Sequence, residues 1–207
     1  MNDVVDFPKI KSPFVRETIN GRYVVTPRIE PGYEWVFQDP GVLAVDKLHG
    51  TNVCVVIEKG VVQAVHNRTQ VLLGSPEIDI RLGGQAQRAL EGILIGLKNL
   101  KNMEGRVYGE LIGPKINGNI HNLSHHQFVP FEYLKSKCHW KSWVRGDYPK
   151  TFEHLSEWFK GSLYSLYTKR VTGLDNWAEG LIFYHPDDRM AKLRRDMFDW
   201  YQGKPHG

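Results

Sequence analysis

The sequence contains few cysteines and no long apolar segment. Cys54 and Cys138 are the two cysteines among 207 residues, too few for a disulfide framework, so we expect free thiols. No apolar run approaches the roughly 18 residues that span a membrane. The opening residues, Met1-Asn2-Asp3-Val4-Val5-Asp6, lack the basic and then apolar order of a signal peptide. These absences predict a globular cytoplasmic protein without a membrane partner.

Internal repeats, low-complexity tracts and abrupt shifts of composition are also missing. We therefore expect one domain over residues 1–207, and a hydrophobic content of 41% is enough for a sizeable core. The formal net charge of +4 favours anionic partners but does not identify one.

One region combines positive charge with aromatic rings. Its members are Lys135, Lys137, Lys141, Arg145, Tyr133, Trp140 and Trp143. This mixture is typical of nucleic-acid contacts, in which cations pair with phosphates and rings stack on bases. A solvated loop with its rings anchored in the core has the same pattern, and the sequence does not choose between the two.

Strands dominate the readable segments. They are Val42–Val45, Val53–Ile57, Val61–Val65, Arg106–Ile112, Gln127–Leu134, Gly180–Tyr184 and Met190–Arg194. Lys59-Gly60 is typical of a hairpin turn between the second and third of them. The segment from Ser136 to Lys150 is expected to be a long loop.

Two helices are predicted from the spacing of apolar residues. The first runs over Gln85–Leu100, with Ala86, Leu90, Ile93 and Leu97 on one stripe. The second runs over Phe152–Leu166, with Phe152, Leu155, Phe159 and Leu163 on one stripe and Thr151 as N-cap. Because strands and helices do not alternate regularly, we expect an α+β fold built on antiparallel sheets.

The segment Lys47-Leu48-His49-Gly50-Thr51-Asn52 is the strongest chemical signal. A lysine three residues before a glycine is a weak pattern alone, and Lys115-Ile116-Asn117-Gly118 matches it too. Lys47, however, ends an apolar strand, and another strand follows at once, whereas Lys115 lies in a loop rich in Gly, Pro and Asn. Lys47 is therefore the candidate nucleophilic amine.

Carboxylates and further cations stand in or beside other strands. Glu179 precedes the strand Gly180–Tyr184, and Glu110 shares a strand face with Tyr108. Lys192 and Arg194 alternate on a strand, so both cations fall on one face, where they could hold a phosphate chain. Glu91-Gly92-Ile93-Leu94 copies the Glu179 pattern but falls inside a predicted helix.

These segments resemble, in the right order, motifs I, III, IIIa, IV and V of the covalent nucleotidyltransferases, which include ATP-dependent ligases and capping enzymes. The matching residues are Lys47-Leu48-His49-Gly50-Thr51-Asn52, Tyr108-Gly109-Glu110, Phe131-Glu132, Glu179-Gly180-Leu181-Ile182 and Lys192-Leu193-Arg194.

The resemblance covers roughly residues 7 to 195. It is greatest to the double-strand-specific, nick-sealing RNA ligases and to compact phage RNA-ligase-like proteins that open on Phe-Pro-Lys-Ile, here Phe7-Pro8-Lys9-Ile10. A phage-encoded protein acting in the host cytoplasm would fit it. The fold that it implies is an antiparallel-sheet, ATP-grasp-like ligase adenylation domain.

The resemblance implies that Lys47 attacks the α-phosphate of ATP and forms a lysyl-AMP intermediate. Attack requires a neutral amine, whereas an ordinary lysine has a pKa near 10.4 and is protonated; neighbouring cations, a metal ion or desolvation would favour the neutral form. Glu179 would bind the catalytic Mg²⁺ or Mn²⁺. Lys192 and Arg194 would neutralise charge on the α-phosphate and the departing pyrophosphate.

The same resemblance implies roles for the remaining candidates. Glu110 would hold the ribose and Phe131 would stack on adenine. Arg68 would contact ribose or the 5′-phosphate of the nucleic acid. His49 and Asn52 would belong to the nucleotide-phosphate site and the strand-joining step. Asp46 would approach the adenine edge.

Two departures from the family pattern affect the expectation. Arg194 stands where the family often has lysine, and the two side chains grip a phosphate differently, so rate or step preference could differ. From the short segment after Arg194 we expect neither an oligonucleotide-binding barrel nor a helical carboxy-terminal domain. A partner protein in place of that domain is therefore one expectation.

The resulting hypothesis is an ATP-dependent RNA ligase that joins 3′-hydroxyl and 5′-phosphate ends. A minimal DNA ligase and, more distantly, a capping guanylyltransferase are alternatives of the same class. A nucleotide- or RNA-binding module without turnover is an alternative of another class. Lys47, Glu110, Glu179 and Lys192 together argue against the binding module, because binding alone does not require an amine placed at a phosphorus atom.

Overall fold

The structure is a computed structural model that describes residues 4–5, 7–74, 84–147 and 150–203. It contains two compact units, which are described separately. The first comprises residues 1–8 and 49–136, and the second comprises residues 9–48 and 137–207. The chain therefore crosses between the units at three places. Both are built on antiparallel sheets with helices, which confirms the predicted α+β class.

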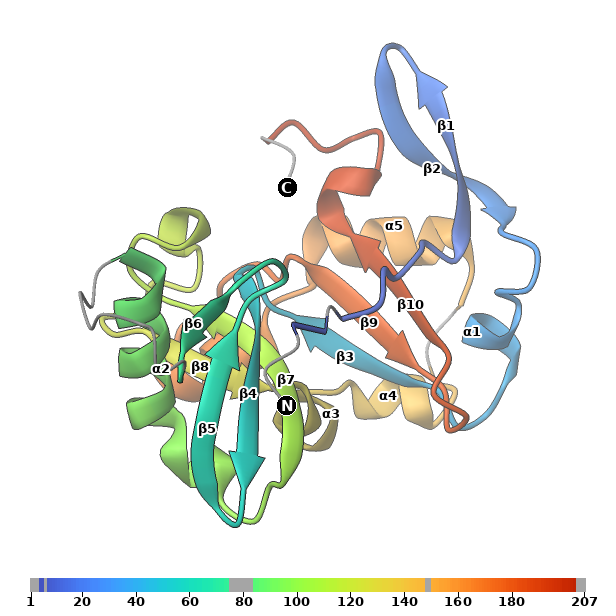
Figure 1. Ribbon diagram of the computed structural model, residues 1–207. Helices are drawn as coiled ribbons and strands as arrows, with labels where there is room; N and C mark the ends of the chain where they lie inside the picture. Colours follow the sequence, from blue (N-terminus) through green and yellow to red (C-terminus); the bar gives the residue numbers. More distant parts are fainter. Residues whose placement is uncertain (1–3, 6, 75–83, 148–149, 204–207) are drawn as a thin grey trace. The chain divides into compact units, whose positions relative to one another are not determined.

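A five-stranded antiparallel sheet forms the centre of the first unit, in the order β6-β5-β4-β7-β8 (Figure 1). The strands are β4 Thr51–Glu58, β5 Val61–His66, β6 Val71–Leu73, β7 Gly105–Ile112 and β8 Gln127–Pro130. Lys59 and Gly60 have φ angles of 52° and 73° and make the predicted turn of the β4–β5 hairpin. The predicted strands around Lys59-Gly60 are confirmed.

Helix α2, Gly84–Leu100, packs along this sheet and confirms the first predicted helix (Figure 1). Its buried positions include Ala89, Ile93 and Leu100, so the stripe is displaced from the predicted one, and the predicted Leu97 side chain lies outside the described part. Gly92 lies where a Cβ atom would meet the backbone nitrogen of Phe128 at 3.0 Å. The Glu91-Gly92 segment, which copies the Glu179 pattern in sequence, is thus part of a contact between helix and sheet.

The predicted strand Gln127–Leu134 is wrong in its second half. Strand β8 ends at Pro130, and helix α3 runs over Phe131–Lys137. A proline has no N–H to continue a sheet ladder and is tolerated at strand ends. Phe131 therefore lies at the start of a helix, and the loop predicted from Ser136 begins two residues too early.

The second unit holds a three-stranded antiparallel sheet of order β10-β9-β3 and a separate hairpin, β1-β2. The strands are β1 Phe14–Ile19, β2 Arg22–Ile29, β3 Leu43–Lys47, β9 Gly180–Tyr184 and β10 Met190–Arg194. The predicted strands β3, β9 and β10 are confirmed. The hairpin was not predicted, because Arg, Glu and Thr interrupt the apolar alternation of its strands.

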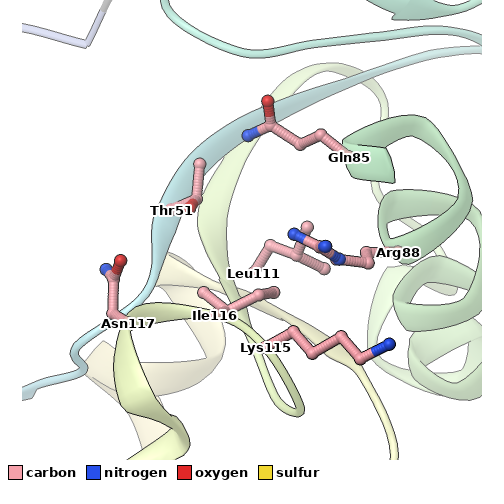
Figure 2. Close-up of a pocket in the computed structure, with 7 residues that line it drawn as sticks. All are labelled: Thr51, Gln85, Arg88, Leu111, Lys115, Ile116 and Asn117. Carbon is pink, nitrogen blue, oxygen red and sulfur yellow. The ribbon is translucent and has the colours of Figure 1, made fainter. Parts of the chain in front are cut away.

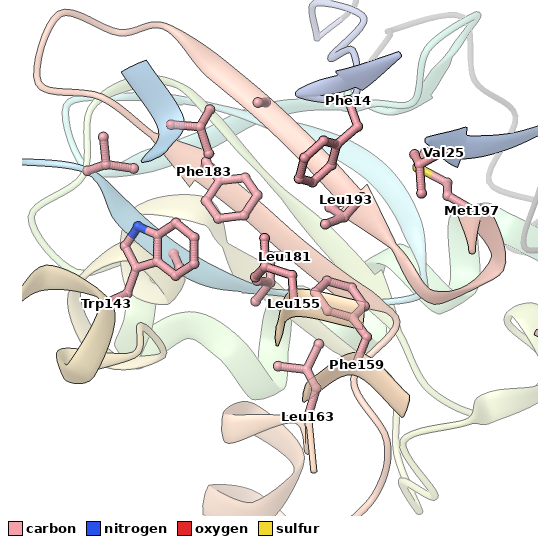
Figure 3. Packing of buried hydrophobic residues seen from close by; sticks show 14 of the residues in the cluster. Phe14, Val25, Trp143, Leu155, Phe159, Leu163, Leu181, Phe183, Leu193 and Met197 are labelled. Atoms are coloured by element: carbon pink, nitrogen blue, oxygen red, sulfur yellow. The ribbon is translucent and has the colours of Figure 1, made fainter. Parts of the chain in front are cut away.

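Helices pack on the three-stranded sheet around an aromatic and aliphatic core (Figure 3). They are α1 Trp35–Gln38, α4 Lys141–Val144 and α5 Phe152–Gly161. Helix α6, Leu166–Thr172, follows α5 in the same unit. Short 3₁₀ turns cover Asn117–Asn119 in the first unit (η1) and Arg195–Met197 in the second (η2). Fully buried core residues include Trp143, Leu155, Phe159 and Phe183.

The second predicted helix is shorter than expected. The Thr151 side chain accepts a hydrogen bond from the amide of His154 at 3.4 Å and confirms the predicted N-cap. The helix ends at Gly161, and Ser165 caps the separate helix α6. Leu163, on the predicted stripe, is buried between these helices and not within one.

The end of α3 and helix α4 interrupt the long loop predicted from Ser136 to Lys150, so that prediction was wrong for Ser136, Lys137 and Lys141–Val144; Tyr148 and Pro149 lie outside the described residues. Trp143 is 1% exposed and Trp140 packs against the same core, which favours the core-anchored interpretation of these rings. Among the residues that the structure describes, no helix has the length and apolarity needed to cross a bilayer.

Candidate functional site

Lys47 and Glu179 form an ion pair in the second unit. Lys47 ends β3 and pairs with Gly180 of β9, so Glu179, the residue before β9, lies beside it. The Lys47 Nζ donates to the Glu179 Oε2 at 2.6 Å and to the Leu48 carbonyl at 3.3 Å. The Glu179 side chain is 1% exposed and that of Lys47 is 20% exposed. A buried carboxylate thus fixes the direction of an accessible amine.

Two further cations lie on the strand next to β9. Lys192 and Arg194 pair with Ile182 and Gly180, and their positions alternate with buried Ala191 and Leu193, which confirms that the cations share a face. Arg194 contacts Asp196 at 3.0 Å and lies 4.0 Å from Glu179.

The charges in this group affect one another. Burial lowers the pKa of Lys192, and the positive charges of Arg194 and Lys47 lower it further, against the opposing charge of Glu179. A cluster of cations around one buried carboxylate favours binding of an anion, because the anion relieves the repulsion among the cations. We call Lys47, Glu179, Lys192 and Arg194 the lysine cluster.

Asp46 points away from solvent, although the resemblance implied an adenine contact for it. Its carboxylate is 1% exposed and accepts hydrogen bonds from the Ser165 hydroxyl at 2.7 Å and the Tyr167 amide at 2.9 Å. Burial raises its pKa to about 6. In this structure Asp46 joins the end of β3, next to Lys47, to the start of α6.

In the first unit, the part of the lysine motif that contains His49 and Gly50, which we call the Gly50 loop, is held from several sides. The Gly50 amide donates to the Glu110 Oε1 at 3.1 Å, and the Gly50 carbonyl accepts from the Asn117 side-chain amide at 2.6 Å. The His49 amide donates to the His121 Nε2 at 3.1 Å. A Cβ atom at position 50 would lie 2.3 Å from the Leu111 carbonyl oxygen. Glycine is therefore required here by close packing.

Asn52 and Arg68 lie elsewhere in the first unit. Asn52 pairs with Glu110 across β4 and β7 and is partly buried. Arg68 is exposed in the turn after β5. The side-chain oxygen of Asn67 accepts from the amides of Thr69 and Gln70, each at 2.9 Å, and so fixes that turn. The sequence correctly placed Arg68 at a strand end.

Phe131 is partly buried, and the Phe7 ring packs against it with centroids 5.0 Å apart. Phe7 also lies 5.4 Å from the Tyr108 ring, and the Tyr108 hydroxyl donates to the Val5 carbonyl at 3.1 Å. Tyr108 and Phe131 thus share an aromatic group with the amino-terminal segment of the same unit.

Sequence reasoning missed Arg16 of β1 as a member of the cation group. Burial and the positive charge of Arg194 both lower the pKa of Arg16. The positive charge of Arg16 in turn lowers the pKa of Lys192. The Arg16 guanidinium lies 4.2 Å from the centroid of the Tyr23 ring. No sequence signal marked Arg16, because the hairpin that carries it was not predicted. Asn117 and His121 were missed for a different reason, since only tertiary contacts bring them to the Gly50 loop.

The donor set for a divalent metal ion is small. Within the described residues, no three His, Cys, Asp or Glu side chains are grouped to hold a metal ion. Magnesium is commonly bound by one or two carboxylates together with substrate phosphates and water. Glu179 fits that pattern as the one carboxylate ligand, with phosphates and water completing the coordination. A metal site made of protein side chains alone would need more ligands than Glu179.

The chain was compared with known protein families and structures. A family model described as RNA ligase matches residues 42–199, a range that holds every residue of the lysine cluster. No curated protein matches the chain.

Solved structures of a Naegleria gruberi RNA ligase are similar to the chain. For an apo mutant the identity is 19% and the TM-score 0.47, with 91% of this chain and 61% of that chain covered. For the enzyme with PPi the identity is 20%, the TM-score 0.45 and the coverages 91% and 61%. For a mutant with ATP and Mn the identity is 20%, the TM-score 0.45 and the coverages 89% and 59%. The chain spans about three fifths of the length of these structures.

Proposed function

The chain belongs to the RNA ligase family, and we propose that it seals RNA with ATP through a lysyl-AMP intermediate on Lys47. The observation that carries the proposal is the Lys47–Glu179 pair, an accessible amine held at 2.6 Å by a buried carboxylate. Lys192 and Arg194 supply positive charge on the neighbouring strand. Phosphoryl-type transfer depends largely on such positioning and electrostatics.

In the first proposed step the neutral Lys47 amine attacks the α-phosphorus of ATP. A nitrogen–phosphorus bond forms, the bond to the bridging oxygen breaks, pyrophosphate leaves and the amine loses a proton to solvent. Lys192 and Arg194 neutralise charge on the α-phosphate and the leaving group. Glu179 would hold a Mg²⁺ or Mn²⁺ ion, which would supply further charge neutralisation when bound.

In the second and third proposed steps the AMP passes to a 5′-phosphate end of RNA, and a 3′-hydroxyl then displaces it. Residues of the first unit serve nucleotide and RNA recognition in this proposal: Glu110 for the ribose, Phe131 for adenine, Arg68 for ribose or the 5′-phosphate, and His49 and Asn52 for the phosphates and the joining step. The interleaving of the two units along the chain supports treating residues 1–207 as one adenylyltransferase domain.

Intact-mass measurement after incubation with ATP and Mg²⁺ or Mn²⁺ tests the first step. We expect an AMP-sized adduct on the wild-type protein and on Lys160→Ala, an exposed lysine of the same unit, and none on Lys47→Ala. Pyrophosphate treatment beforehand removes AMP acquired during expression. If the treated wild-type protein forms no adduct, the enzyme proposal fails and a non-catalytic binding module replaces it.

A sealing assay tests the substrate. Nicked duplexes with the same sequence in RNA and in DNA, each with a 5′-phosphate at the nick, are given to the adenylylated protein. Faster sealing of RNA supports the proposal, whereas faster sealing of DNA supports the minimal DNA ligase.

A further inference from the structure

A cavity in the first unit lies beside the Gly50 loop and belongs to none of the roles assigned above. It has a volume of about 180 Å³ and opens between the first turns of α2, the start of β4 and the loop after β7 (Figure 2). Thr51 begins β4 at its edge, and Leu111 and Ile116 provide apolar surface. A water molecule takes up about 30 Å³ in the liquid, so the cavity has room for a small polar group with some of its hydration.

Arg88 and Lys115 give this cavity positive charge. Arg88 is partly buried on α2, whereas Lys115 is exposed in the loop after β7. In the part of the chain that the structure describes, no carboxylate lines the cavity, and neither cation forms an ion pair. Burial of a charge without a partner is unfavourable, which applies to the partly buried Arg88, while the exposed Lys115 adds positive charge at the edge. Two unneutralised cations at a cavity indicate an anionic ligand.

Side-chain amides complete the lining and connect it to the motifs. Asn117 lines the cavity and also donates to the Gly50 carbonyl at 2.6 Å. Gln85 lines the opposite side and accepts from the Asn67 side-chain amide at 2.9 Å, in the turn that presents Arg68. Figure 2 shows Gln85 and Arg88 extending from α2 toward Thr51 and Leu111. The cavity is thus fixed, within one unit, to both the Gly50 loop and the Arg68 turn.

We propose that this cavity binds a phosphate group of the RNA substrate, with Arg88 and Lys115 as the cations and Gln85, Thr51 and Asn117 as hydrogen-bonding groups. The inference rests on the proposed RNA ligase function. Cations with neutral hydrogen-bonding groups and no carboxylate suit a phosphodiester, and such contacts fix the register of a nucleic acid without reading its sequence. Lys115, the lysine of the second Lys-x-x-Gly match, is therefore an RNA ligand.

Binding of a nicked RNA duplex to the full chain, measured by fluorescence anisotropy at several salt concentrations, tests this site. The variant is Arg88→Ala with Lys115→Ala, and the matched control is Lys98→Ala, an exposed cation in the last turn of the same helix. We expect about tenfold weaker RNA binding for the double variant and a shallower salt dependence, with a slope smaller by about 1. The control should bind as the wild type does, and Arg88→Lys with Lys115→Arg should recover most of the affinity.

Self-adenylylation without RNA separates this inference from the proposed function. We expect the double variant to form the AMP adduct at the wild-type rate, because the ligand is RNA. Unchanged RNA binding by the double variant would overturn the phosphate site, and so would loss of the adduct, which would assign the cavity to ATP. If the wild-type protein forms no adduct, the ligase function fails, whereas RNA binding that depends on Arg88 and Lys115 would still support the site.

Discussion

Glu110 accepts a hydrogen bond from the backbone amide of Gly50 at 3.1 Å, so a carboxylate of β7 holds the Gly50 loop of the lysine motif. The contact connects two motifs that the sequence separates by sixty residues. The resemblance assigned Glu110 to the ribose of the nucleotide. The structure adds a local task for the same side chain, which is to fix the backbone three residues after Lys47.

Gly50→Ala should damage both stability and adenylylation. A Cβ atom there would lie 2.3 Å from the Leu111 carbonyl oxygen and 2.6 Å from the Ile112 Cγ2, so the loop must move. We expect a loss of about 1–3 kcal/mol in the free energy of unfolding, typical of overpacking, together with slower adduct formation. Urea unfolding and intact mass measure the two effects. Gly161→Ala, with nothing within 4 Å of the new atom, should stay near wild type in both, and equal behaviour of the two variants would refute the packing argument.

Glu179→Gln should slow self-adenylylation on the order of 100-fold, because the amide replaces the carboxylate that orients the Lys47 Nζ, contacts Arg194 and would hold the metal ion. The shape of the side chain is nearly retained, so the effect should be chemical and not a loss of folding. A time course of adduct mass measures it, with Glu157→Gln, exposed on α5, as the control. A wild-type rate in Glu179→Gln would remove Glu179 from the mechanism.

Asp46 should make stability depend on pH between about 4 and 6. Burial raises its pKa to about 6, so the folded state binds this proton more tightly than the unfolded state, in which an aspartate has a pKa near 3.9. The stabilising contribution is complete below about pH 4 and is lost as the pH rises through 6. At about 1.4 kcal/mol per pKa unit, the free energy of unfolding of Asp46→Asn should rise by about 2 kcal/mol relative to that of the wild type between pH 4 and pH 7. Urea unfolding across this range measures the difference, and parallel curves for the two proteins would contradict it.

Lys192→Met should abolish most adenylylation without lowering the melting temperature. Burial, Arg194 and Lys47 lower the pKa of Lys192, which means that its charge is unfavourable in the folded protein and that a neutral side chain relieves the repulsion. The lost positive charge should slow adduct formation on the order of 100-fold. Thermal unfolding and intact mass are measured together, and Lys192→Arg serves as the charge-retaining control. A lower melting temperature with normal activity would show that Lys192 is structural.

The sequence by itself determined the features that depend on neighbours along the chain. The β4–β5 hairpin follows from Lys59-Gly60 between two apolar runs, and the shared face of Lys192 and Arg194 follows from the two-residue period of a strand. Thr151 was identified as a cap because a capping side chain bonds within its own first turn. In contrast, the hairpin β1-β2 was missed because its strands lack apolar alternation. Helix α3 was missed because the residues after Pro130 show no apolar periodicity typical of a helix.

Contacts between distant residues were decided by tertiary structure alone. The order of the motifs indicated that Lys47 and Glu179 act together. Their 2.6 Å contact depends on the register of β3 against β9, which places Lys47 opposite Gly180. The burial of Asp46 against Ser165 and the cavity beside Arg88 and Lys115 also depend on which elements pack together. Local patterns set strand period and turn chemistry because those involve adjacent residues, whereas register and packing are selected by the whole core at once.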